Sequence, residues 1–388
     1  MKEIYFDNCL VGSGPAAISF MLARSLHSNK KDKLLWIEGG DFSDDEELTY
    51  KNNSFSSPKY DNIDFQKSNK KFINHYNINC QDISIVSCIR KGGNGAIWGS
   101  AISEFTEKEF GLPKVNYNEL LHAYKKVSDN FSFLNAYENY LNKKNPLKIV
   151  SNIKKLISKK SRKKNFNINY PRLAINLTNK KRYLYDYKTE SIINDDNLGI
   201  FNTKLEIDNF KNNPNVIFKE NHILNKFIFK DDIFEIEILD IRHNRKKIIK
   251  SKKITLAAGA IGSPILISRF LKENILTRIQ HNPGFFFAFL DFNLNFMSSK
   301  EEFVRLANAE YEINDKDFKK IFGQIYPSKI LTNKILKEKY KLLKFVPSFL
   351  LNLIKKQVFL STVYLEGSFS STYMKINKKN VKIFSYNY

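Results

Sequence analysis

Cysteine is scarce in this chain of 388 residues. The three cysteines, Cys9, Cys80 and Cys88, form no Cys-x-x-Cys pair and have no spacing typical of metal ligands. The usual sequence signatures of zinc sites and dithiol redox motifs are therefore excluded, and we expect no metal site. A low, odd number of cysteines also favours a reducing compartment in which the thiols are simply buried.

The sequence also has no long hydrophobic run. No stretch approaches the roughly 18 uninterrupted apolar residues that a membrane-spanning helix requires. The first residues, MKEIYFDN, include acids and have no basic segment ahead of an apolar core, so we expect no signal peptide. Both absences favour a cytoplasmic protein, with peripheral contact at a membrane surface as the alternative.

Acidic residues are too few to balance the basic ones, and the formal net charge is +23. One interpretation is compositional drift, because Lys, Asn, Ile and Phe are all abundant. The other is a functional basic face that attracts an anionic membrane, an acidic glycan or nucleic acid. Residues 151–182, the most basic segment, permit either a solvated face or an acidic partner. Since the basic residues form no recognisable nucleic-acid motif, we do not expect nucleic acid.

A second basic segment, ILKEKYKLLKFVPSFLLNLIKK at residues 335–356, is amphipathic. Pro347 is placed to break or kink it. The ordinary interpretation is a pair of helices facing the core, and the alternative is an anchor lying in the plane of a membrane.

Glycine is concentrated in a few places, and the first of them is VGSGPAAISFMLARSL, residues 11–26. A strand over Ile4–Val11 is expected before it, a helix over Ala16–Leu26 after it, and then a second strand, LLWIE, that ends at Glu38. Gly12 would permit the tight turn, and the bare backbone of Gly14 would admit a pyrophosphate at the helix N-terminus. A carboxylate at Glu38 would hold the adjoining ribose. The stretch therefore predicts either a dinucleotide cradle or a tight turn with nothing bound.

Two further segments support the first reading. Ile83–Ile89 alternates like a strand and is followed by Gly92-Gly93-Asn94-Gly95, a second loop of bare backbone. Residues 215–256 read as a meander of short strands with turns at Asp231-Asp232 and His243-Asn244. The meander ends in LAAGAIGSPILISRFL, a buried strand followed by a helix.

Together, the GSGPAA loop with Glu38, the GGNGAIWGSAISEF loop and the AAGAIGSP segment resemble the glucose–methanol–choline (GMC) oxidoreductases, over roughly residues 1–285. The resemblance implies FAD as cofactor and an alcohol or sugar as substrate. It places the FAD pyrophosphate, flavin and adenosine against Gly12, Ser13, Gly14, Pro15, Ala16, Glu38, Gly92, Gly93, Asn94, Ala96, Trp98, Gly99, Ile223, Ala257, Ala258 and Gly259.

Histidine marks the departure from that family. The family's catalytic His lies in a C-terminal segment, whereas the last of the six histidines here is His281. The catalytic base is therefore unknown, with His281 as the one local candidate. A truncated or inactive relative with weak or no FAD binding is one alternative, and a basic nucleic-acid- or membrane-binding protein is another.

The expected fold class is α/β, with a Rossmann-like FAD-binding domain of parallel sheet plus β-meander interleaved with a mixed α+β substrate domain. We expect the FAD-binding domain at 1–110 and 205–285, and the substrate or cap domain at 111–204 and 286–388, incomplete at its C-terminus.

Overall fold

The buried strand ahead of the first glycine loop lies near the middle of a six-stranded sheet, with strand order β7-β2-β1-β10-β9-β8. β1 (Tyr5–Val11) pairs in parallel with β2 (Leu34–Ile37) and with the C-terminal half of β10 (Arg245–Leu256). β2 in turn pairs in parallel with β7 (Val216–Lys219). The carboxyl ends of β1, β2 and β10 thus meet at one edge, where ligands bind in open parallel sheets.

The structure is a computed structural model. It describes residues 5–27, 32–40, 63–96, 101–102, 104, 107, 116–130, 165–174, 184–186, 191–193, 201, 203–290, 307, 309–316, 319–327, 333, 336–337, 340–355, 358–377 and 380–386.

An antiparallel meander completes the six-stranded sheet. β8 (His222–Lys230), β9 (Ile233–Asp240) and β10 follow one another with antiparallel pairing. Asp231 and Asp232, with φ of 50° and 59°, form the first turn, and Asn244, with φ of 49°, lies in the second. These short polar side chains tolerate the left-handed region that tight hairpins require. The predicted turns and the predicted parallel sheet plus meander are confirmed.

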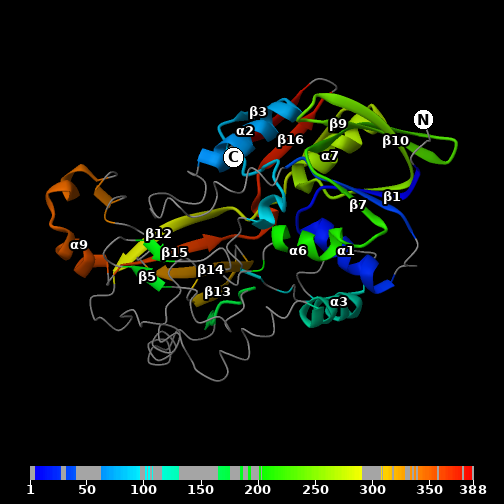
Figure 1. Cartoon of the computed structure of the whole chain (residues 1–388). Helices are drawn as coiled ribbons and strands as arrows, with labels where there is room; N and C mark the ends of the chain where they lie inside the picture. The colour runs from blue at the N-terminus through cyan, green and yellow to red at the C-terminus, as the bar shows by residue number, and fades with distance from the viewer. Residues whose placement is uncertain are drawn as a thin grey trace.

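Helices cover both faces of this sheet. α1 (Pro15–His27) and α6 (Thr203–Lys211) lie on one face, around Leu10, Leu34 and Trp36. α2 (Ile63–Tyr76) and α7 (Gly259–Leu271) lie on the other (Figure 1). The hydrophobic core on that second face is built from strands of the sheet, from α2 and α7, and from segments near the C-terminus. Its buried residues are Phe6, Cys9, Val11, Leu35, Ile37, Phe72, Tyr76, Ile78, Ile89, Ile223, Leu224, Phe227, Ile236, Ile238, Ile249, Ile265, Leu266, Met374, Ile376, Val381 and Ile383.

A second sheet joins distant parts of the chain, in the order β11-β16-β17-β3. Its strands are β11 (Ile275–Arg278), β16 (Thr372–Ile376), β17 (Val381–Ser385) and β3 (Ile78–Gln81). β17 pairs in parallel with β3, and the two strands share the core of the six-stranded sheet. The division at residue 286 stays a prediction, but these C-terminal strands pack against the predicted FAD-binding region.

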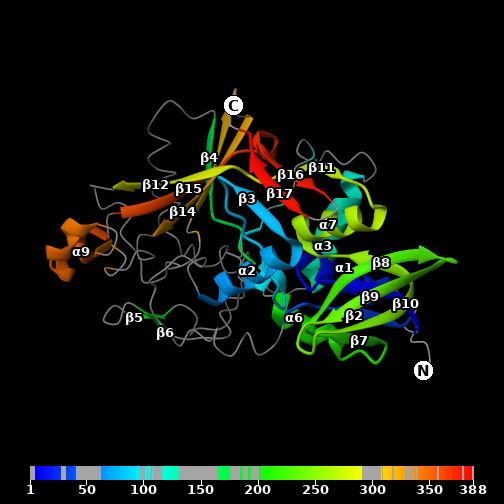
Figure 2. The same cartoon turned by 90° about the horizontal axis from the view of Figure 1, so that it is seen from above.

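A third sheet extends away from the first, in the order β12-β15-β14-β13-β4 (Figures 1 and 2). Its strands are β12 (Gly284–Leu290), β15 (Val358–Tyr364), β14 (Lys319–Pro327), β13 (Ala309–Asp315) and β4 (Phe166–Asn169). The smaller elements are the pair β5 (Leu184–Asp186) and β6 (Ser191–Ile193), the α-helices α3 (Tyr117–Asn130) and α9 (Ser348–Lys355), and the 3-10 helices η2 (Gly93–Ala96), η4 (Lys341–Phe345) and η5 (Gly367–Phe369). No described helix is long and apolar enough to cross a bilayer.

The strand predicted over Ile83–Ile89 is wrong. The segment pairs with no neighbouring strand among the described residues, because side chains of α2 take its carbonyl groups. The Asn69 amide donates to the carbonyls of Ile85 and Ser87, and the Ser68 hydroxyl donates to Ile89. These bonds hold the segment against α2, just ahead of the second glycine loop.

Candidate functional site

A cavity of about 260 Å³ opens at the carboxyl ends of β1, β2 and β10. It is lined by residues 11–16, 37–39, 86–90, 93–94, 222–224 and 257–261 with Phe72 and Tyr76. Twelve of the predicted site residues line it: Gly12, Ser13, Gly14, Pro15, Ala16, Glu38, Gly93, Asn94, Ile223, Ala257, Ala258 and Gly259. Gly92 contacts a lining residue directly and Ala96 ends η2, whereas Trp98 and Gly99 lie outside the described residues.

The first glycine loop has the two properties expected of it. Gly12 has φ of +100°, and a Cβ there would overlap the backbone carbonyl of Ala257, so the turn out of β1 requires glycine. At Gly14 a Cβ would meet only the Gly92 carbonyl oxygen, at 3.9 Å. The first intrahelical bond of α1 runs from the Ile18 amide to the Gly14 carbonyl, so the preceding N–H groups have no intrahelical acceptor. The loop therefore presents bare backbone and a helix N-terminus to the cavity.

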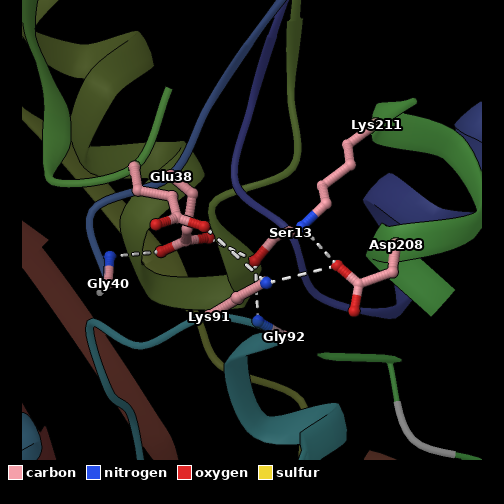
Figure 3. A network of polar contacts seen from close by, with 8 residues as sticks. Ser13, Glu38, Gly40, Lys91, Gly92, Asp208 and Lys211 are labelled. Atoms are coloured by element: carbon pink, nitrogen blue, oxygen red, sulfur yellow. Dashed lines mark hydrogen bonds and ion pairs between the residues drawn. The ribbon is translucent and has the colours of Figure 1, made fainter. Parts of the chain in front are cut away.

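Ser13 ties this loop to the end of β2 and to the second glycine loop (Figure 3). Its hydroxyl donates to Oε2 of Glu38 and accepts from the Gly92 amide at 2.7 Å. The Gly40 amide donates to Oε1 of Glu38 at 2.7 Å. Three segments far apart in sequence are thereby fixed around one buried carboxyl group.

Glu38 is almost completely buried in the cavity wall. Burial raises the pKa of its carboxyl group to about 7, and the hydrogen bonds from Ser13 and Gly40 only partly offset this cost of desolvation. Each carboxylate oxygen has two acceptor sites, and the bonds above use one on each. The group can therefore accept further hydrogen bonds from hydroxyl groups that enter the cavity.

Lys91, which the sequence analysis did not single out, lies beside the second loop and reaches toward Asp208 (Figure 3). Its side chain is fully buried, and its ammonium group lies 3.6 Å from Asp208 and 3.7 Å from Glu220. Thr203, at the start of α6, donates to the Gly92 carbonyl at 2.6 Å. Both contacts anchor the glycine backbone to α6 and to the end of β7, and no local sequence signal marks them.

His222 lines the cavity, and sequence reasoning missed it as well. Its Nδ1 lies 2.5 Å from the backbone carbonyl of Glu220, so Nδ1 carries the proton and donates. Nε2 is buried and has no hydrogen-bond partner among the described residues, with the Asp240 carboxylate 3.9 Å away. With the proton on Nδ1, the ring presents Nε2 as the nitrogen for further contacts beside Ile223, the residue predicted to contact adenine.

His281 lies elsewhere. It follows β11, is exposed, and its Nε2 is 2.9 Å from the Thr372 hydroxyl at the start of β16. It is not among the residues that line the cavity. Within the described part of the chain, no cluster of three or more His, Cys, Asp or Glu side chains could hold a metal ion.

Comparison with known proteins finds similar structures but no similar sequences. No protein-family profile matches the sequence, and no curated protein matches it. The structure is similar to that of formate oxidase, with a TM-score of 0.50 and 10% identity over 99% of this chain and 78% of that chain. A variant of formate oxidase from Aspergillus oryzae, studied for the effect of its mutation on FAD modification, gives a TM-score of 0.49 at 10% identity with the same coverage. A fungal aryl-alcohol oxidase gives a TM-score of 0.41 at 10% identity. The match covers 70% of this chain and 48% of the length of that protein.

The similarity to formate oxidase at a TM-score of 0.50 concerns the fold alone. It agrees with the sheet topology described above, and the chain has a mixed α/β fold like that of formate oxidase.

Proposed function

We propose that the cavity binds FAD and that the protein is an FAD-dependent oxidoreductase of the GMC type, acting on the CH–OH group of a small alcohol or sugar. One observation carries the proposal. The bare first glycine loop, the buried carboxyl group of Glu38 and the second glycine loop all face one cavity at the carboxyl edge of a parallel sheet. This is the edge at which such sheets bind dinucleotides.

The residues present fit the cofactor part by part. The open face of Gly14 and the N-terminus of α1 would receive the pyrophosphate, because free amides and the positive end of the helix dipole attract anions. Glu38 would accept hydrogen bonds from the ribose hydroxyls with its remaining lone pairs. The Nε2 acceptor of His222 suits the amino group of adenine.

The chemistry divides between cofactor and protein. FAD, when bound, supplies the hydride acceptor. The protein must orient the donor and provide a group that takes the hydroxyl proton. We do not assign that role to His281, because it hydrogen-bonds Thr372 outside the cavity.

The proposal draws further support from the shared fold. Formate oxidase, whose FAD modification has been studied in a variant of that protein, has the same fold at a TM-score of 0.50. The choice of an alcohol or sugar as substrate rests on the sequence resemblance alone.

FAD titration with and without a side chain at Gly14 tests the cradle. We expect the purified protein to quench flavin fluorescence, and Gly14→Val to weaken FAD binding by at least about 100-fold, since the side chain fills the face that meets the pyrophosphate. Gly367→Val is the matched control, because a Cβ at Gly367 also meets only ordinary contacts and lies outside the cavity.

Equal FAD affinity in Gly14→Val and the unmodified protein would contradict the cradle, and no flavin binding by the unmodified protein would end the proposal. Bound FAD that no alcohol or sugar reduces would favour the alternative of an inactive relative.

A further inference from the structure

The segment Tyr340–Lys355, which contains η4 and α9, projects from the outer end of the third sheet in both views (Figures 1 and 2). We call it the η4–α9 cap. It lies at the opposite end of the molecule from the six-stranded sheet that carries the cavity. The cap is therefore remote from the cavity.

Among the described residues, few contacts attach the η4–α9 cap to the rest of the protein. Leu351 is buried at 2% exposure, and the Asn333 side-chain amide donates to Asn352 at 3.0 Å. Leu343 and Val346 are half-buried, whereas Leu342 is 84% exposed, Phe345 87% and Phe349 64%. The remaining exposed members are Tyr340, Leu350 and Leu353. The interpretation of residues 335–356 as a pair of core-facing helices is therefore wrong for most of these side chains.

Solvation of so many adjacent apolar groups is unfavourable, and contiguous exposed patches of this kind mark interaction sites. The described helices of the cap are one 3-10 turn and an eight-residue α-helix, too short to span a bilayer. They are long enough to lie in its surface.

Charge identifies the partner. Residues 340–356 contain four lysines, at 341, 344, 355 and 356, and no aspartate or glutamate. Lys341 and Lys344 are exposed beside the apolar side chains. Exposed apolar side chains in a stretch, residues 340–356, that carries lysines and no acid suit the boundary between acyl chains and anionic headgroups. The net charge of +23 draws the whole molecule toward the same kind of surface.

We propose that the η4–α9 cap docks the protein on an anionic lipid bilayer, with Leu342, Phe345 and Phe349 entering the acyl boundary and the lysines contacting phosphate groups. The proposal is independent of FAD binding, because it uses no residue of the cavity. It makes the protein a peripheral membrane protein that keeps its cavity turned away from the lipid.

Vesicle binding by the full chain tests the proposal. We expect sedimentation with vesicles of phosphatidylcholine and phosphatidylglycerol, and much weaker sedimentation with phosphatidylcholine alone. The triple variant Leu342→Ser, Phe345→Ser, Phe349→Ser should bind the anionic vesicles at least about 100-fold more weakly, since three apolar side chains no longer leave water. Lys341→Gln and Lys344→Gln should each weaken binding about fivefold.

Ile248→Ser is the matched control. Ile248 on β10 is an exposed apolar residue as well, at 70%, and it follows Lys246 and Lys247. Because it lies on the six-stranded sheet, its substitution should not change vesicle binding. Insertion is read directly from Phe345→Trp, whose added fluorescence should be quenched by brominated acyl chains. The same measurement on the wild-type protein gives the fluorescence and quenching of the native tryptophans, against which the added signal is compared.

Three results would overturn the proposal. If the triple serine variant binds as well as wild type, the overall charge alone explains the attraction. If Phe345→Trp is not quenched, the cap does not enter the bilayer. If the wild-type protein is a dimer that the triple variant converts to a monomer without change in vesicle binding, the face is covered by a second copy.

Discussion

Glu38→Gln is expected to remove a specific part of the dependence of stability on pH. In the folded protein without ligand, burial raises the pKa of Glu38 to about 7, against an ordinary value of 4.5. The folded state therefore holds a proton that the unfolded chain releases. Its contribution to stability is fully present below about pH 4.5 and is lost as the pH rises through about 7.

The magnitude follows from the two pKa values. A difference of one pKa unit corresponds to about 1.4 kcal/mol, so the complete loss is about 3 kcal/mol, most of it between pH 5 and pH 8. The amide introduced by Glu38→Gln carries no charge at any pH, so the variant should lack this decline. Because every other titrating group is shared, the difference between wild type and Glu38→Gln isolates the one carboxyl group.

Urea unfolding at pH values from 5 to 8 measures the effect. Trp36 is a suitable fluorescent probe, since it is fully buried and its indole N–H donates to the Gly12 carbonyl at 2.7 Å, beside the site. Above about pH 7, where Glu38 is ionised, the same variant should bind FAD roughly tenfold to 100-fold more weakly, because a charged acceptor of ribose hydroxyls is lost. Parallel pH profiles for wild type and variant would show that Glu38 is not buried and protonated in the protein without ligand.

Three further substitutions test the supporting structure by urea unfolding. Gly12→Ala should cost about 2–4 kcal/mol, because φ is +100° and the added methyl overlaps the Ala257 carbonyl; an unchanged midpoint would mean that the turn is not tight. Burial lowers the pKa of His75 to about 4, so only the unfolded chain takes up a proton as the pH falls from 6.5 to 4, and the wild type should lose about 2 kcal/mol of stability over that range. His75→Gln should abolish this loss of stability. A variant that loses as much stability toward low pH as the wild type would contradict this. Lys91→Met should cost about 3 kcal/mol by leaving Glu220 in a buried setting without the ammonium group, whereas a neutral effect would show that the ion pairs contribute nothing.

Local patterns were sufficient to predict the order of elements around the first glycine loop. The order of strand, glycine loop, helix and strand ending in Glu38 depends on neighbours within about forty residues, and the turn at Asp231-Asp232 depends on two. Such features follow from backbone preferences that each short segment carries by itself. The structure brings Gly12, Gly14 and Glu38 to one cavity as that local order requires.

Contacts across long separations could not be predicted in the same way. Ile83–Ile89 has the alternation of a strand, but Asn69 from α2 takes its carbonyls, and nothing in the segment announces that partner. Lys91 looks like one more surface lysine until Asp208, more than a hundred residues away, is placed beside it. Burial of a polar group is decided by tertiary packing, which the linear pattern does not contain.

The parallel pairing of β17 with β3 has a consequence for synthesis of the protein. Among the described strands, β3 has no other neighbour, and Tyr76 of the cavity wall lies in the same core as β17. When a ribosome has translated only as far as residue 370, every residue lining the cavity has been made, yet β17, which packs into the same core as Tyr76, has not. The core that contains β3 and Tyr76 is therefore incomplete in the growing chain. It stays accessible to chaperones and proteases until Val381–Ser385 emerge from the exit tunnel.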